Sequence, residues 1–273
     1  MRAFVLRPLP MTLSSTNTAA GYDATYAGND LMGVVWKAAA AAAPKLKADL
    51  GTVPNPVDAA LLFAVGGAAT QLRVRAADNS GMTTNLYDSG IIPLLAGTEM
   101  PVSGLGVGWW TKDDGAITRR YWEFEFSAAA GTVAPSVGRV TIGERITLAR
   151  NFAFGGAWGV RDLGKADFSA GGALLRRRAA KLRVLGITFP HVHKDEIERH
   201  VLPLIEGHGA QDPIVLCTDP AADVMRQRRC WFGPLTGDLG TTWRTSAGWE
   251  WRANLIDLTP IPAGPLYVPP VNV

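Results

Sequence analysis

The stretch KLRVLGITFPHVHKDEIERHVLPLIEGHGAQDPIVLC, residues 181–217, places a predicted strand, a predicted helix and a second predicted strand in succession. Residues 183–189 have the β-branched and aromatic character of a half-buried strand. After Pro190 the apolar spacing changes to that of one helix face, formed by Ile197, Val201, Leu204 and Ile205. The rest of the chain reads as β, so we expect one amphipathic helix that covers a sheet.

Both ends of this helix are marked in the sequence. Asp195 and Glu196 stand in its first turn, where carboxylates are favoured by the helix dipole, and Gly207 follows its last apolar residue as a stop signal. Pro203 lies inside the pattern, where it would remove a hydrogen bond at a cost of about 3 kcal/mol. We therefore expect a kink or an early last turn at Pro203.

Composition describes a folded globular protein. The chain has 273 residues, of which 47% are hydrophobic and 19% charged, and this length favours two cores over one large β domain. No apolar run reaches the roughly 18 residues of a membrane helix, so we predict no membrane insertion. Residues 1–11 hold no apolar core of about 7–15 residues and no small-residue cleavage site, so we predict no secretion signal.

Cysteine count and net charge exclude two classes of protein. Cys217 and Cys230 are too few for a disulfide framework and are expected to be reduced, buried thiols. The net charge of +3 is too small to indicate nucleic-acid binding by itself. We predict no sequence-specific contact with nucleic acid.

The first half of the chain reads as a series of short strands. Turn-forming residues at 54–56, 66–67 and 79–81 separate the predicted strands 46–51, 57–65 and 71–76, while residues 106–115 read as a glycine-rich loop. Residues 121–126 alternate strictly, with Trp122, Phe124 and Phe126 on one face. That alternation predicts a core strand whose other face is wet.

This order of strands resembles the discoidin type of galactose-binding-like jelly roll over about residues 10–128. The pieces that carry the resemblance are VVWK at 34–37, LKADLG at 46–51, VDAAL at 57–61, RVRA at 73–76 and RYWEF at 120–124. Such domains usually bind glycans or lipid head groups through loops at one end of the sandwich. The resemblance implies that the loops around residues 21–23 and 106–115 occupy that end.

The small-residue tract at 127–135 is the predicted boundary between a discoidin-like sandwich, residues 1–130, and a second sandwich with one flanking α-helix, residues 131–273. The predicted fold class is therefore mainly β with two sandwich domains. Glycine pairs at 155–156 and 171–172 bracket a polar, hairpin-like region that we expect to protrude.

The second half resembles the tail-tube-like sandwich of siphophage distal tail proteins over about residues 130–260. The resemblance rests on GRVTIG at 138–143, the stretch 181–217, CWFGPL at 230–235 and WEWRANL at 249–255, and the order of the two domains is reversed relative to better-known members. It implies a homo-oligomeric ring, sixfold by analogy with tail tubes, that joins the tail tube to the baseplate hub. The implied location is the virion tail, assembled in the host cytoplasm.

The sequence contains two candidate contact sites, one basic and one aromatic. The basic site could touch phosphates, but pairing with acidic groups of a neighbouring subunit is favoured. We expect loop 151–170 to take part in the same subunit contact. The basic site consists of Arg176, Arg177, Arg178, Lys181 and Arg183.

The second candidate site is a glycan site on the first sandwich. Trp109 and Trp110 follow a glycine-rich run, and we expect at least one indole to be exposed on a loop. A sugar could stack on that ring, with Tyr22, Asp23 and Asp113 at the same loop end. The alternative is that these tryptophans are buried anchors.

Metal binding and catalysis are weakly indicated. All four histidines fall within residues 191–208, but their spacing matches no known closed metal set, so we predict no metal and no cofactor. The sequence lacks a Gly-x-Ser-x-Gly elbow, a phosphate loop and a His-Glu-x-x-His helix, so we predict no enzyme.

We therefore expect a structural protein of a phage tail tip that forms a ring and assists host attachment to a surface glycan. The alternative is a carbohydrate-binding module protein that mediates cell-surface adhesion. A metal-dependent enzyme is a remote third reading.

Overall fold

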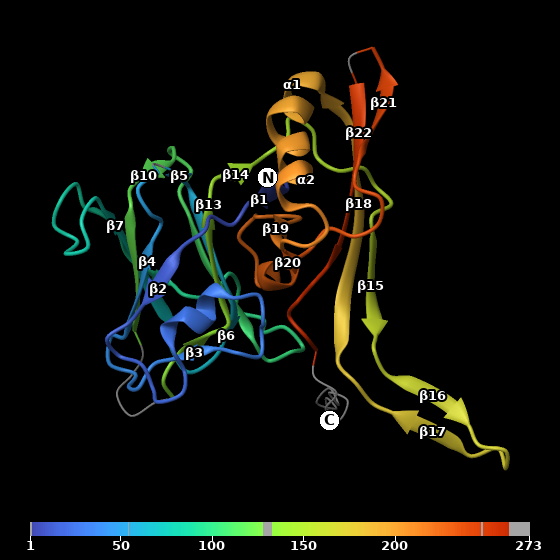
Figure 1. Ribbon diagram of the computed structural model, residues 1–273, viewed down its shortest axis with the longest axis horizontal. Helices are drawn as coiled ribbons and strands as arrows, with labels where there is room; N and C mark the ends of the chain where they lie inside the picture. The colour runs from blue at the N-terminus through green and yellow to red at the C-terminus, as the bar shows by residue number, and fades with distance from the viewer. Residues whose placement is uncertain (1, 54, 128–132, 247, 262–273) are drawn as a thin grey trace.

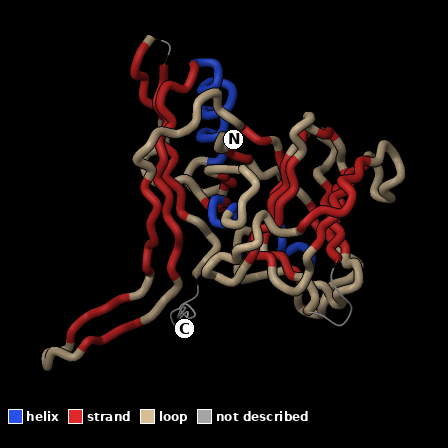
Figure 2. The backbone as a smooth tube through the Cα atoms, turned by 180° about the vertical axis from the view of Figure 1, so that it is seen from behind, coloured by secondary structure: helices blue, strands red, loops and turns tan. Residues whose placement is uncertain are grey.

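The computed structural model describes residues 2–53, 55–127, 133–246 and 248–261 and is mainly β. Within that part of the chain, four main sheets lie side by side, as Figure 1 shows, and two-stranded ladders extend them. Figure 2 shows the same arrangement from behind, with the helices confined to short segments beside the strands. The predicted fold class, mainly β with sandwich packing and one flanking helix, is confirmed.

The outermost sheet has five antiparallel strands in the order β2-β4-β11-β7-β8. Every second side chain of the central strand β11 points inward, and Trp122, Phe124 and Phe126 are wholly buried there, as predicted. The strands are β2 (Thr12–Ser14), β4 (Lys45–Asp49), β11 (Tyr121–Ser127), β7 (Gln71–Ala77) and β8 (Tyr87–Pro93).

The second sheet is buried on both faces. Its strands are β13 (Arg139–Gly143), β6 (Ala59–Val65) and β9 (Gly106–Thr111). Along β6, Leu62 faces the core shared with the outer sheet, while Leu61 faces a core on the opposite side. A strand buried on both faces reads as a continuous apolar run, which is what β6 has.

Short elements close the ends of this sandwich. They are η1 (Ala24–Gly28) and the ladders β12 (Ser136–Val137) with β3 (Trp36–Lys37) and β10 (Ile117–Thr118) with β5 (Pro56–Val57).

The third sheet joins the two ends of the sequence. It runs β14 (Arg145–Ile146), β1 (Phe4–Leu6), β19 (Ile214–Cys217) and β20 (Cys230–Gly233). Because side chains alternate along a strand, Phe4 packs toward the second sheet and Val5 packs toward the fourth.

The fourth sheet contains β15 (Ala157–Asp162), β18 (Lys181–His193), β22 (Gly248–Ile256) and β21 (Thr241–Thr245). Its inner face shares a core with the helix α1 (Lys194–Glu196), η2 (Ile197–Val201) and α2 (Leu202–His208). A further short helix, η3 (Arg226–Arg229), precedes β20. The hairpin β16 (Lys165–Phe168) and β17 (Leu174–Arg177) extends from β15 and β18.

The predicted strand–helix–strand unit is confirmed as β18, the helix and β19. The strand continues past Pro190, where the pairing with β22 shifts and His191 adopts a φ of 53°. A proline has no N–H for the ladder, and a bulge accommodates it. The irregularity expected at Pro203 is a π-helical turn that ends just before it.

The predicted boundary at residue 130 falls outside the described residues. Strand pairing crosses it in both directions, because β13 pairs with β6 while β1 pairs with β19. Residues 136–143 thus complete the first sandwich. The division into residues 1–130 and 131–273 does not follow the sheets.

Candidate functional site

The hairpin β16/β17 and the strand β15 that leads to it form an arm that projects from the body (Figures 1 and 2). Every residue of β15, β16 and β17 is exposed, and the protrusion predicted for this region is confirmed. The arm nevertheless carries large apolar side chains, which are Trp158, Val160, Leu163, Phe168, Leu174 and Leu175.

Packing among the described residues does not account for an arm of this composition. A two-stranded hairpin is marginally stable alone in water, and a contiguous exposed apolar patch indicates a contact with another molecule. On one face of the arm, Phe168 and Leu174 are directly paired and are 70% and 46% exposed. The sequence predicted a polar protrusion and did not predict that its apolar side chains would be exposed. Apolar and polar residues alternate there in the same way as in a strand with one buried face.

The basic residues predicted for subunit contact fall into two groups. Arg176 and Arg177 belong to β17, and Arg178 follows it, and all three are exposed. The Lys181 ammonium lies 3.9 Å from the Asp162 carboxylate within the same hairpin.

Arg183 is an internal residue, contrary to the prediction of a subunit contact. Its Nε donates to Asp257 Oδ2 at 2.7 Å, and its Nη1 donates to the Arg228 carbonyl at 2.9 Å. Burial raises the pKa of the Asp257 carboxyl, while Arg183 acts in the opposite direction. The pair fastens β18 to β22 and β20 and is not available to a neighbouring subunit.

Tyr22 and Asp23 lie at one end of the first sandwich. The Tyr22 side chain is 42% exposed, and the Lys37 ammonium lies 5.7 Å from its ring centroid. Asp23 caps η1, where its Oδ1 accepts hydrogen bonds from Thr25 N at 2.8 Å and Thr25 Oγ1 at 2.7 Å. The bonds from Thr25 lower the pKa of the Asp23 carboxyl, so it is ionised at neutral pH.

Trp109 and Trp110 do not lie on a loop, and this prediction is wrong. Both belong to β9 and are 8% and 3% exposed. They point in opposite directions, as expected for successive strand residues, but each enters a core. The Arg226 guanidinium covers the Trp109 ring at 4.5 Å from its centroid. Both indoles are therefore largely covered.

Asp113 is exposed, but it is not near Tyr22 and Asp23. Its carboxylate accepts a hydrogen bond from Arg145 Nη1 at 2.9 Å, beyond the last residue of β13. The η1 end of the sandwich is marked instead by the ion pair of Asp30 with Arg139, the first residue of β13. The predicted glycan-site residues therefore lie at opposite ends of β13 and do not form one site.

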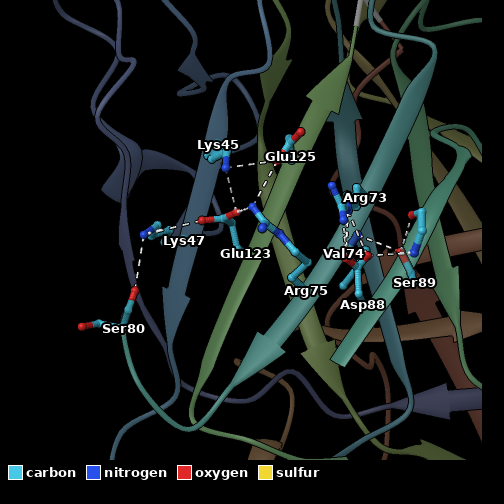
Figure 3. A network of polar contacts seen from close by, with 11 residues as sticks. Lys45, Lys47, Arg73, Val74, Arg75, Ser80, Asp88, Ser89, Glu123 and Glu125 are labelled. Carbon is cyan, nitrogen blue, oxygen red and sulfur yellow. Dashed lines mark hydrogen bonds and ion pairs between the residues drawn. The ribbon is translucent and has the colours of Figure 1, made fainter. Parts of the chain in front are cut away.

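The exposed face of the outermost sheet carries a network of charges (Figure 3). Glu123 is only 2% exposed, and it pairs with Arg75, with the Lys45 ammonium at 3.3 Å and with the Lys47 ammonium at 3.5 Å. Glu125 pairs with Lys45 at 3.1 Å. The face predicted to be wet thus contains a buried carboxylate, which is tolerated because three cations surround it.

This network joins neighbouring strands of the outermost sheet by ion pairs. Each acidic side chain has at least one cation within 4 Å, including Asp88, which Arg73 Nε contacts at 2.9 Å. The hydrogen bond from Arg73 lowers the pKa of Asp88.

The histidines are spread along β18 and the helix. His191, His193 and His200 are exposed, and His208 is half-buried. Within residues 2–53, 55–127, 133–246 and 248–261, no three His, Cys, Asp or Glu side chains gather closely enough to hold a metal ion. The helices of this same part of the chain are too short and too polar to cross a membrane.

Comparisons with known proteins complete the description of the site. A scan against protein-family models found no match, and a search of curated proteins found none either. The structure is similar to the family 32 carbohydrate-binding module of NanJ from C. perfringens, solved in complex with galactose, at 17% identity and a TM-score of 0.39. That match covers 51% of this chain and 98% of the module.

Two further modules are similar over 50% of this chain. One is chitosan-binding module 1 of the chitosanase/glucanase from Paenibacillus sp. IK-5, at 16% identity, 97% coverage of the module and a TM-score of 0.40. The other is CBM32-1 from a family 31 glycoside hydrolase of Clostridium perfringens, at 14% identity, 98% coverage and a TM-score of 0.38. Each of these three matches covers about half of this chain.

Proposed function

We propose that this protein is a non-enzymatic interaction protein that docks into a larger assembly through its arm. The observation that carries the proposal is the full exposure of β16 and β17 together with the apolar side chains Phe168, Leu174 and Leu175. Burying one such side chain contributes about 1.5–3 kcal/mol, so contact along the arm supplies several kcal/mol. The neighbouring Arg176 and Arg177 favour an acidic margin on the surface that receives the arm.

The partner that we favour is another copy of this chain. The sheet that carries the arm has two outer strands, β15 and β21, and both are largely exposed. A head-to-tail contact that uses different surfaces of each copy generates a ring when the rotation closes. The resemblance of residues 130–260 to distal tail proteins supports a sixfold ring at a phage tail tip that joins the tail tube to the baseplate hub. The structures named above supply no support for that placement.

The mass of the purified protein tests the proposal. We expect light scattering after gel filtration to give a multiple of the chain mass, and electron microscopy to show rings. The double variant Phe168→Ser with Leu174→Ser should reduce the mass to that of one chain without lowering the unfolding temperature, because both side chains are exposed. Ile91→Ser, which alters a side chain 65% exposed on β8, is the matched control and should keep the assembly.

A protein that stays monomeric at all concentrations would contradict self-assembly. An assembly that survives the double variant would show that the arm is not the contact. These two results are distinguishable because the first tests whether an oligomer forms at all. The second tests only which surface of the chain makes the contact.

A second candidate function is glycan binding by the first sandwich. The observation that favours it is the exposed Tyr22 ring beside the ionised Asp23, whose Oδ2 receives no hydrogen bond from the described residues. An aromatic face and a carboxylate oxygen are the groups that hold a sugar. This candidate has counterparts among the modules named above, which the phage placement lacks.

Calorimetric titration with galactose and with chitosan oligomers tests it. Tyr22→Ala should abolish the heat of binding with the unfolding temperature unchanged, while Tyr26→Ala on η1 serves as the control at a position outside the pair. An absence of binding to either glycan, or equal binding by Tyr22→Ala, would count against this site.

A further inference from the structure

A cavity of about 500 Å³ lies where the base of the arm meets the body of the protein. Its apolar lining comes from segments far apart in the sequence: Val102 and Leu105, then Trp158 and Val160 of β15, then Met225 and Ile261. Cavities of this size and apolar character are typical of small-molecule sites.

Two residues that line the cavity each carry a buried hydrogen-bonding group with no partner among the described residues. Trp231 Nε1 and Thr259 Oγ1 are buried, and neither forms a hydrogen bond with the described residues. Trp231 is 3% exposed and Thr259 is 9% exposed, and both side chains line the cavity. Buried polar groups in folded proteins are nearly always paired, so two orphaned groups in one cavity indicate a polar group that belongs there.

The charge of the cavity wall is positive. Arg183 and Arg229 line it but are already paired, with Asp257 and with Asp219 respectively. Arg228 is exposed at the rim, and its side chain has no ion pair or hydrogen bond within the described residues. No Asp or Glu is among the lining residues of the described chain. The wall therefore offers an unpaired cation and two neutral donors to one ligand.

We propose that this cavity binds an amphiphilic acid, a molecule with an apolar body and an oxyanion head such as a carboxylate or sulfonate. The apolar body contacts Val102, Leu105 and Val160. The head accepts hydrogen bonds from Trp231 Nε1 and Thr259 Oγ1, and Arg228 supplies the compensating charge. The site is independent of self-assembly through the arm tip, which lies further along the hairpin.

The test uses the full chain and the fluorescent probe anilinonaphthalene sulfonate, an apolar body with a sulfonate head. We expect saturable binding at one site per chain and displacement by decanoate, with decanol at least tenfold weaker because it lacks the charge. Trp231→Phe keeps an aromatic ring, though a smaller one, and removes the donor, and should weaken probe binding about tenfold, as for one hydrogen bond to a charged group. Arg228→Met should weaken decanoate about tenfold and leave decanol unchanged.

Matched controls separate these effects from damage to the fold. Arg252→Met removes an exposed arginine on the outer face of β22, and should leave probe binding unchanged. Trp231→Phe should still unfold in one cooperative transition, at a lower temperature than the parent because the smaller ring leaves space at a buried position.

Three results obtained with a protein that binds the probe would overturn the proposal. They are probe binding that none of the variants weakens, displacement by decanol as strong as by decanoate, and displacement by galactose instead of decanoate. The first two results would mean that the cavity binds the apolar body of a ligand without recognising its oxyanion head group. The third would make the cavity a glycan site. A folded protein that does not bind the probe would also overturn it.

Discussion

Cys217 and Cys230 lie directly opposite each other on the antiparallel strands β19 and β20, and both side chains are fully buried. The next pair along the ladder is hydrogen-bonded, because Thr218 N donates to the Arg229 carbonyl at 3.0 Å. Hydrogen-bonded and non-hydrogen-bonded pairs alternate, so the cysteines occupy a non-hydrogen-bonded pair, in which Cα atoms are typically about 4.5 Å apart. That spacing lies within the range that a disulfide spans.

We predict that oxidised glutathione converts this pair into a disulfide with the loss of two hydrogen atoms per chain, while the glutathione is reduced to its thiol. Burial raises the pKa of the Cys217 thiol well above its usual range, so little reactive thiolate exists in the folded state. The reaction should therefore be slow in buffer and faster in mild denaturant. Intact mass spectrometry with and without thiol alkylation measures it.

Cys217→Ala supplies the control for that reaction and should gain a glutathione adduct at Cys230 only after partial unfolding. An alkylation pattern that stays fully reduced after oxidation in mild denaturant would show that the strands do not bring the two sulfurs together.

Trp110→Ala should lower the free energy of unfolding by about 3–5 kcal/mol, the range for deleting a buried aromatic side chain. Trp110 packs edge-on against Trp122 at 5.4 Å between ring centroids. Trp243→Ala is the matched comparison, because Trp243 is 65% exposed and only stacks on Trp249 at 5.7 Å. It should cost about 1 kcal/mol, the value of one aromatic pair. Urea unfolding measures both, and equal losses would contradict the burial difference.

Two threonine-to-valine changes should have different effects on the free energy of unfolding. Thr141→Val removes a buried hydroxyl that donates to the Leu61 carbonyl at 2.8 Å, and should cost about 1 kcal/mol of unfolding free energy. Thr259→Val removes a buried hydroxyl that has no partner among the described residues, and should leave stability unchanged or raise it. If Thr259→Val proved as costly as Thr141→Val, a hydrogen bond to the Thr259 hydroxyl would have to exist in the ligand-free protein.

Acid should destabilise the protein through His208. Burial lowers the pKa of His208, Arg7 lowers it further, and Asp212 raises it slightly. Because the folded pKa lies below the unfolded value of about 6.5, the stabilising contribution is present above that pH and is lost as the pH falls toward the folded pKa. His208→Gln should therefore lose less stability than the parent between about pH 7 and pH 5.

Thermal unfolding across that pH range measures the difference between the two curves. His200→Gln alters an exposed position on the same helix and should follow the parent curve. Parallel curves for the parent and His208→Gln would show that His208 titrates alike in the folded and unfolded chains.

Elements with a clear burial period were predictable from the sequence. The helix after β18 and the alternation along β11 follow directly from which side chains must be buried. β9 was missed because its glycines read as turn formers. In the structure they permit close packing, since a Cβ at Gly108 would lie 2.8 Å from Leu62 Cδ1. A glycine needed for packing between strands and a glycine needed for a turn look the same in one sequence.

Pairing between distant strands could not be predicted from local patterns. A fragment that ends at the predicted boundary near residue 130 would lack β13, so its partner β6 would lose one hydrogen-bonded neighbour. The same limit applies to the candidate sites. Tyr22 and Asp113 were placed together by their loops, but β13 separates those loops, and the cavity beside Trp158 is assembled from segments more than a hundred residues apart.

The position of β1 sets the order in which the chain can fold during synthesis. Phe4, Val5 and Leu6 are synthesised long before their ladder partners on β19, which are residues 215–217. Until those are made, the apolar strand β1 has no complete sheet to join, and contacts between such distant residues form slowly. A nascent chain thus carries an exposed β1 edge until β19 is made, and a chaperone that shields β1 during that interval should raise the yield of folded protein.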